Sequence, residues 1–323
     1  MTLNTINNTI LEEMKTNELD QLKYYKWKLG DRYDGWRVRN VDTVFSVIPF
    51  FLRTRMDSQN LFEEQLNIDH LEDFIKEHKE DIPGLSLMHI IMAAHIRLIS
   101  QRPHLNRFVI WNKIFARNHI NFAIAVKRTL SDEGEETLIK PYFLPTDTLQ
   151  EVVRKVIKEQ QENQQVGQSN DSDKISKIMG LLPSFVLRAT VFFLLGMDKV
   201  GIMPKVINKA SPWHCTMFLT NIGSIGVESI YHHLYEFGTC SMFVAMGKKS
   251  RSHVMDRTGE LKVRKSIHLK FVLDERICDG FYYAASMRLL SKYLADPSLL
   301  LSPPEKVVMD EGIRKIKVLK LKI

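Results

Sequence analysis

The sequence predicts a mixed α/β domain built in layers, because short hydrophobic strands are interspersed with helices along the chain. Residues 118–127 and 266–273 alternate apolar with polar or small side chains, which is typical of strands with one buried face. Residues 86–102 instead repeat apolar side chains at the spacing of one helix face. The two periods together favour a sheet covered by helices.

The elements follow in order along the chain. The predicted strands are residues 60–69, 118–127, 215–220, 241–246 and 266–273. The predicted helices are residues 71–80, 86–102, 147–161 and 281–294. Ser86 is placed to cap the second helix and Pro103 to end it. The polar run 159–173 predicts an exposed loop, since it holds too little apolar surface to order itself.

Composition excludes several protein classes. The chain has 323 residues, 44% of them apolar, which excludes collagen, low-complexity disorder and a polytopic membrane protein. Lys and Arg (45) outnumber Asp and Glu (38), but the basic residues are dispersed and no nucleic-acid recognition motif appears. The three cysteines form neither a disulfide framework nor a metal motif, and the first residues lack a signal-peptide pattern. We therefore expect a cytoplasmic protein without a bound metal or a nucleic-acid partner.

Residues 178–197 are unusually apolar, with Arg188 as the one charged residue. A helix over residues 185–197 would measure about 20 Å, shorter than the ~30 Å hydrocarbon core of a bilayer. We expect a buried or interfacial helix, which would allow a peripheral membrane contact. Residues 314–323 alternate cations with apolar side chains, which predicts a lysine-protected edge strand or a second contact with an anionic bilayer.

Two stretches carry the most specific information. Residues 273–281 read LDERICDGF and lie between a predicted strand and a predicted helix, and residues 218–226 read FLTNIGSIG and leave a strand. Both stretches resemble the catalytic domain of the 2-oxo-acid dehydrogenase dihydrolipoyl acyltransferases, which shares the fold of chloramphenicol acetyltransferase. The resemblance runs in order from about Pro49 to Leu301. Its segments are residues 53–59 (an opening helix in the family), 66–71, 86–94, 103–106, 121–126, 220–223, 274–280 and 296–300.

The resemblance implies a two-layer chloramphenicol acetyltransferase-like sandwich and a homotrimer with active sites between subunits. Residues 1–48 would then be an N-terminal extension and residues 49–323 the acyltransferase-like domain, with an insert at about 163–210. The family moves an acyl group from coenzyme A or lipoamide to a thiol, hydroxyl or amine. Neither a lipoyl domain nor an Ala/Pro-rich linker is recognisable, so we expect acyl-coenzyme A as the substrate and no covalently attached lipoyl group.

The resemblance also implies roles for individual residues. Glu275 stands where the family has its catalytic histidine, which removes the proton of the acceptor. Thr220 is at the position of the hydroxyl that stabilises the tetrahedral oxyanion, and Asp279 is at the position of a structural carboxylate that pairs with an arginine. Asn221, Gly223 and Arg276 would line the substrate channel.

Other residues have weaker claims on the site. His214 would supply a substitute base if it faced the channel, and of the tandem His232-His233 at most one can face the site. Cys278 lies inside the motif, but we expect it to be a small core side chain.

Two readings of Glu275 remain open. In the first, Glu275 is the base of an acyltransferase. In the second, Glu275 pairs with Arg276 or another cation, and the chain is a catalytically retired binding or assembly module. A third hypothesis is a peripheral membrane acyltransferase that acts on a lipid-linked acceptor.

Overall fold

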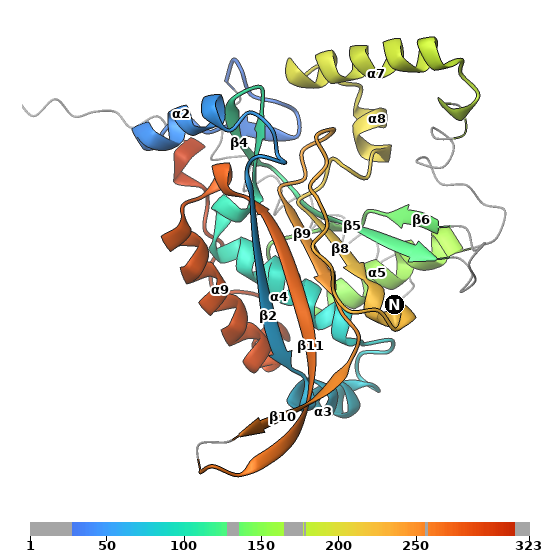
Figure 1. Ribbon diagram of the computed structural model, residues 1–323, viewed down its shortest axis with the longest axis vertical. Coiled ribbons are helices and arrows are strands. Elements are labelled where there is room, and N and C mark those ends of the chain that lie inside the picture. Colours follow the sequence, from blue (N-terminus) through green and yellow to red (C-terminus); the bar gives the residue numbers. More distant parts are fainter. Residues whose placement is uncertain (1–27, 128–135, 165–176, 178, 256–257, 314–323) are drawn as a thin grey trace, which may run out of the picture.

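A computed structural model describes residues 28–127, 136–164, 177, 179–255 and 258–313. A mixed sheet of eight strands forms its centre, and the helices α4 (Leu87–Gln101), α5 (Leu149–Gln164) and α9 (Gly280–Ala295) cover one face of that sheet (Figure 1). The predicted mixed α/β architecture is confirmed.

The remaining elements complete the two layers. The strands are β1 (Gly35–Arg37), β2 (Gln59–Asn67), β3 (Arg107–Ile110), β4 (Lys113–Arg117), β5 (Ile120–Lys127), β6 (Glu136–Ile139), β7 (Tyr142–Phe143), β8 (Met217–Asn221), β9 (Met242–Met246), β10 (Ser250–Met255) and β11 (Leu261–Asp274). The other α-helices are α2 (Thr43–Phe51), α3 (Asp69–His78), α7 (Ser184–Lys199) and α8 (Lys205–Ala210). The short 3₁₀ helices of the described residues are η1 (Pro103–Asn106), η2 (Ile222–Ile225), η3 (Glu275–Ile277), η4 (Pro297–Leu300) and η5 (Glu311–Ile313).

The long strand β11 organises the sheet. It pairs antiparallel with β2 along one side and with β9 and then β10 along the other. Next to β9 comes β8, parallel to it, and then β5, parallel to β8. The strands β6 and β7 both pair antiparallel with β5. The strands β1, β4 and β3 form a separate antiparallel sheet, so part of the predicted N-terminal extension is hydrogen-bonded to the main body. The boundary near residue 48 stays a prediction.

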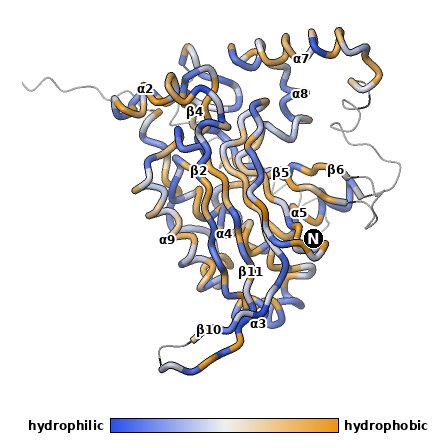
Figure 2. The backbone as a smooth tube through the Cα atoms, in the orientation of Figure 1, coloured by the Kyte–Doolittle hydropathy of each residue, from blue (hydrophilic) through white to orange (hydrophobic). Residues whose placement is uncertain are grey.

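The alternation in β11 has the predicted consequence. Ile267, Leu269 and Phe271 point into the core beneath the helices, whereas Val272 packs on the opposite face with Phe218 of β8. Stripes of apolar and polar residues along the strands follow this alternation (Figure 2). The sheet therefore has a second, smaller apolar layer on the face that the helices leave open.

Two local predictions were wrong. Ser86 precedes α4, but its hydroxyl lies 2.9 Å from Nδ1 of His89 and caps no backbone N–H. Residues 53–59 do not form an opening helix, because α2 ends at Phe51 and a turn follows. In that turn the Thr54 hydroxyl donates to Asp57 at 2.6 Å and accepts from its N–H at 3.1 Å, a local bonding pattern that competes with a helix.

The insert is partly helical. Residues 159–164 continue α5, so the first part of the predicted loop at 159–173 is helix, and residues 165–173 lie outside the described residues. The apolar segment forms α7, followed by α8. In the described part of the chain no helix combines the length and the apolarity that a membrane crossing requires. Residues 314–323 lie outside the described residues, so the predicted edge strand stays a prediction.

Buried histidines of α4 predict acid sensitivity. His95 is fully buried with Nδ1 2.7 Å from the Ile91 carbonyl, and burial lowers its pKa to about 4. The unfolded histidine takes up a proton below pH ~6.5, whereas the folded one does so only near pH 4, so stability falls as the pH drops through this window. The free energy of unfolding falls between pH 7 and pH 5, and we expect this fall to be about 2 kcal/mol smaller in His95→Leu than in the original chain.

Urea unfolding at the two pH values measures this difference. The exposed His253 on β10 provides the matched control, since His253→Leu should leave the pH dependence as in the original chain. Equal pH dependence in both variants would contradict the burial argument.

Candidate active site

The LDERICDGF segment forms the turn between β11 and α9. Asp274, the last residue of β11, is fully buried and makes an ion pair with Arg276. Nε of Arg276 donates to one carboxylate oxygen of Asp274 at 2.8 Å, and Nη2 donates to the other at 2.7 Å. Nη1 of the same guanidinium donates to the Leu52 carbonyl at 3.0 Å. The turn is therefore locked at its base by a bidentate pair that is closed to solvent.

Glu275 does not share this arginine. Its backbone N–H donates to the Ser58 carbonyl at 2.9 Å, and its side chain is half-buried. Within the described residues, the Glu275 carboxylate has no hydrogen-bond or ion-pair partner. Of the two open readings of Glu275, the pairing with Arg276 is not found, because the geometry of the turn directs the guanidinium to Asp274. Arg276 is equally unsuited to the substrate channel, since its side chain is only 3% exposed.

Asp279 has a different structural role from the one expected. It is exposed at the N-terminus of α9, where its carboxylate accepts a hydrogen bond from the Tyr282 N–H at 2.7 Å. No arginine pairs with it among the described residues, and Asp274 holds the arginine instead. Asp279 therefore anchors the turn as a helix cap. Cys278 is buried in the main core, as predicted, and burial raises its pKa to about 12.

The TNIG segment lies at the end of β8. Thr220 and Asn221 are half-buried, and within the described chain neither side chain acts as a donor to any group. Gly223 follows in η2, where a Cβ atom would lie 2.3 Å from the Gly247 carbonyl oxygen and 2.8 Å from the Lys248 nitrogen. The glycine is required here because two backbone segments approach each other closely.

Thr220 and Glu275 lie far apart along the strands of the sheet. Thr220 is level with Ala245 of β9, which pairs with Lys270 of β11. Glu275 follows Lys270 by five residues, a distance along the strand of about 17 Å. One chain therefore does not bring its predicted base and its predicted oxyanion donor to the same substrate atom.

His214 belongs to a buried polar network. Its Nδ1 lies 2.7 Å from the Ser211 hydroxyl and its Nε2 lies 3.3 Å from the Asp198 carboxylate. Asp198 in turn pairs with Arg32 at 2.6 Å, and Arg32 pairs with Asp34 at 2.7 Å. Burial lowers the pKa of His214, so the neutral ring donates from Nε2 to Asp198. His214 is thus a structural residue, and the hypothesis of a substitute base there is not supported.

Sequence reasoning missed this network. Arg32 and Asp198 are 166 residues apart, so no spacing rule connects them. One signal was present: Asp198 is the first acidic residue after a long apolar run, and a carboxylate in such a setting needs a partner. The tandem histidines add nothing to the site, since His232 stacks on Phe243 with ring centroids 4.3 Å apart and His233 stacks on His232.

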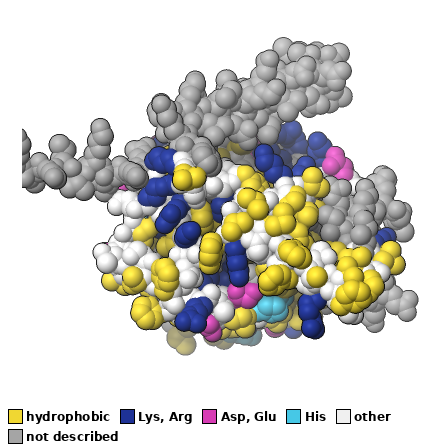
Figure 3. Space-filling model, turned by 90° about the horizontal axis from the view of Figure 1, so that it is seen from above, with side chains coloured by type: hydrophobic (Ala, Val, Ile, Leu, Met, Phe, Trp, Pro, Cys, Tyr) yellow, Lys and Arg dark blue, Asp and Glu magenta, His cyan; other side chains and the backbone are white. Residues whose placement is uncertain are grey.

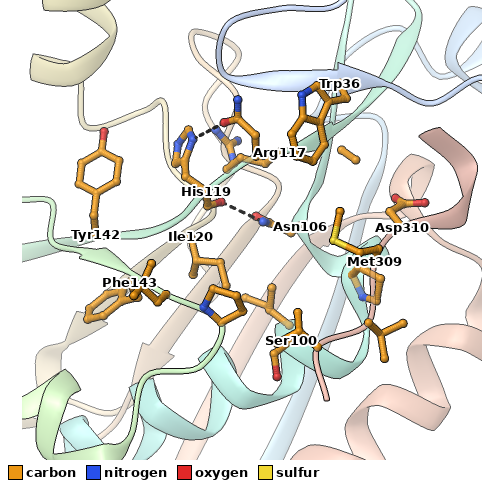
Figure 4. A pocket seen from close by; sticks show the side chains of 18 of the residues that line it. Trp36, Ser100, Asn106, Arg117, His119, Ile120, Tyr142, Phe143, Met309 and Asp310 are labelled. Carbon is orange, nitrogen blue, oxygen red and sulfur yellow. Dashed lines mark hydrogen bonds between the residues drawn. The ribbon is translucent and has the colours of Figure 1, made fainter. Parts of the chain in front are cut away.

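A cavity of about 150 Å³ lies elsewhere, between α4, β5 and the C-terminal residues 307–313 (Figure 4). Trp36, His119 and Tyr142 line it, and Asn106 beneath them donates to the His119 carbonyl at 2.9 Å. Burial lowers the pKa of His119 to about 3, so this ring is neutral at physiological pH. Neither motif reaches the cavity. Among the described residues no group of His, Cys, Asp and Glu side chains is arranged to hold a metal ion.

Comparison with known proteins locates the similarity in the part of the chain that carries both motifs. Residues 213–302 match the family model described as 2-oxoacid dehydrogenases acyltransferase (catalytic domain), which is less than a third of the chain. No curated protein matches the chain.

Several solved structures align with most of the chain at low identity. The cubic core of the pyruvate dehydrogenase multienzyme complex has 14% identity and a TM-score of 0.47 over 80% of this chain and 88% of that one. The truncated catalytic core of the 2-oxoacid dehydrogenase multienzyme complex from Thermoplasma acidophilum has 15% identity and a TM-score of 0.46, covering 80% and 97%. A chloramphenicol acetyltransferase has 10% identity and a TM-score of 0.43, covering 76% and 92%.

The close backbone approach at Gly223 gives a direct test of the TNIG geometry. Gly223→Ala should lower the free energy of unfolding by about 1–3 kcal/mol, because the added methyl group meets rigid backbone atoms. Gly280→Ala is the matched control in the other motif, since a Cβ there would meet nothing within 4 Å. Thermal unfolding of both variants compares them, and equal melting temperatures would contradict the described packing.

Proposed function

We propose that this protein is a coenzyme-A-dependent acyltransferase whose active site forms between two copies of the chain in a homotrimer. In this proposal Glu275 of one copy is the general base and Thr220 of the neighbouring copy stabilises the oxyanion. The family-model match over residues 213–302 supports it, because that stretch contains both motifs.

The free carboxylate of Glu275 is the observation that carries the proposal. In a catalytically retired site, Glu275 would be free to form an ion pair. The nearest candidate partner in the sequence is the buried Arg276. That arginine donates three side-chain hydrogen bonds to Asp274 and Leu52, and the turn presents Glu275 without a partner among the described residues. A base has to be available to its acceptor in this way.

The separation within one chain supports a shared site. Thr220 and Glu275 are about 17 Å apart along the strands, too far for both to contact one thioester carbonyl. A cyclic trimer joins two different surfaces of neighbouring copies, and such a contact would bring the two residues together. Asn221 and Gly223, adjacent to Thr220, would line the same channel.

The chemistry then needs only these groups. Glu275 takes the proton from the thiol, hydroxyl or amine of the acceptor as that atom attacks the thioester carbonyl of acyl-coenzyme A. The hydroxyl of Thr220 donates a hydrogen bond to the oxyanion that forms. Collapse of this intermediate breaks the carbon–sulfur bond, and the coenzyme A thiolate leaves and takes up the proton from Glu275. Burial strengthens a carboxylate as a base, so a neighbouring copy that covers the turn would favour the first step.

Mixed trimers test the shared site. Glu275→Gln should reduce transfer from acetyl-coenzyme A to dihydrolipoamide by about 10²–10⁴-fold, and Thr220→Val by about 10²–10³-fold. When the two variant chains are produced together, about a quarter of the sites in a random trimer contain both native groups. Activity should then recover to about a quarter of the level of the original protein, measured as release of the coenzyme A thiol.

The matched control mixes the Glu275→Gln chain with a chain that carries both substitutions. Neither chain of this mixture has Glu275, so no site in it is complete. If the mixture of the two single variants forms trimers but recovers no activity, a site shared between copies is contradicted. Full activity of Glu275→Gln alone would remove this residue from the mechanism and favour the alternative of a catalytically retired binding or assembly module.

A further inference from the structure

The helix α7 exposes large apolar side chains along one face, and its opposite face is partly buried. Its sixteen residues contain one buried side chain, the carboxylate-bearing Asp198. The large apolar side chains that are exposed on α7 and next to it are Leu181, Phe185, Phe192, Phe193, Val200, Ile202 and Val206. An exposed cluster of large apolar side chains marks a surface that meets a partner or a lipid bilayer.

The buried network holds α7 in place. Asp198 at the end of the helix pairs with Arg32 at 2.6 Å and lies 3.3 Å from His214. Burial alone would raise the pKa of Asp198, but the hydrogen bond from His214 and the charge of Arg32 hold that pKa at about 2. The anchor is therefore ionised at every physiological pH. The helix is fixed to the body at this end and projects away from the sheet (Figure 1).

The exposed charges around α7 all have the same sign. Across the described part of residues 177–210, the exposed charged side chains are Lys177, Arg188, Lys199, Lys205 and Lys209. Asp198 is the one acidic residue of this stretch, and it is buried. Seen from above, lysine and arginine side chains lie among and beside hydrophobic ones at this end of the molecule (Figure 3).

A second apolar helix lies at the same end of the molecule. In α2 the one buried residue is Pro49, and Val44, Val47, Phe50 and Phe51 are exposed. Both α2 and α7 lie beyond the end of the sheet, opposite to the β10–β11 hairpin (Figure 1). We call this end of the molecule, defined by α2 and residues 177–210, the apolar end.

We propose that the apolar end docks on an anionic lipid surface, with α7 lying flat in the interface. The helix measures about 24 Å, shorter than the ~30 Å hydrocarbon core, so its length suits an interfacial position. Phenylalanines on a helix flanked by lysines and arginines match acyl chains and phosphate headgroups together.

The charge pattern favours lipid over a second copy of this chain. A contact between the α7 helices of two copies would place their cations against each other. Anionic headgroups instead neutralise these cations. The proposal does not depend on the acyltransferase activity, because none of its residues belongs to the two motifs.

Sedimentation with vesicles tests this docking. The full chain is mixed with phosphatidylcholine vesicles that either contain or lack phosphatidylglycerol. We expect binding that requires phosphatidylglycerol and weakens with salt. The double variant Phe185→Ser/Phe192→Ser should bind at least about tenfold more weakly, and Arg188→Glu/Lys205→Glu should also lose at least about tenfold.

The matched control lies at the other end of the molecule. Leu261 and Val263 on the β10–β11 hairpin are exposed to a similar degree, and Leu261→Ser/Val263→Ser should bind vesicles as the original chain does. Equal vesicle binding by the Phe185/Phe192 variant and this control would overturn the proposal. The proposal would also be overturned if the original chain did not bind anionic vesicles and light scattering showed a changed oligomer mass for the Phe185/Phe192 variant. That result would mean that a second copy covers the apolar end.

Discussion

The ion pair between Asp274 and Arg276 determines what the candidate site can do. It closes the end of β11, directs two donors of the guanidinium to Asp274 and, through a third donor, ties the turn to the Leu52 carbonyl. Two buried charges of opposite sign cost less together than apart, so the pair is self-contained. Because Arg276 pairs with Asp274, the neighbouring Glu275 lies at the surface of the turn without this arginine as a partner. Asp279 also lacks it and caps α9 instead.

A consequence of this arrangement is that the chain presents two half-sites. The turn after β11 and the turn after β8 lie far apart along the strands, and each offers a side chain that this chain does not use as a donor or base. The close contact of Gly223 with Gly247 keeps the second turn rigid, as the ion pair keeps the first. Assembly of copies, rather than movement within one copy, is what the proposed chemistry requires.

The sequence was informative where one local pattern decides the structure. Strict alternation over 266–273 predicted β11 and its buried face, since a period of two fits only a strand. It failed where several partners compete. Arg276 has three carboxylates within three residues, and only the direction of the turn selects Asp274. Residues 53–59 are compatible with a helix, but Thr54 and Asp57 bond to each other. The contact of Arg32 with Asp198 joins distant segments and has no local signature.

Calorimetric titration of the purified protein with acetyl-coenzyme A tests the central claim most directly. The account predicts binding with a dissociation constant on the order of micromolar, one ligand per chain, and only in the assembled oligomer. Absence of binding by the assembled protein, for acetyl-coenzyme A and for longer acyl-coenzyme A thioesters alike, would contradict the acyltransferase account.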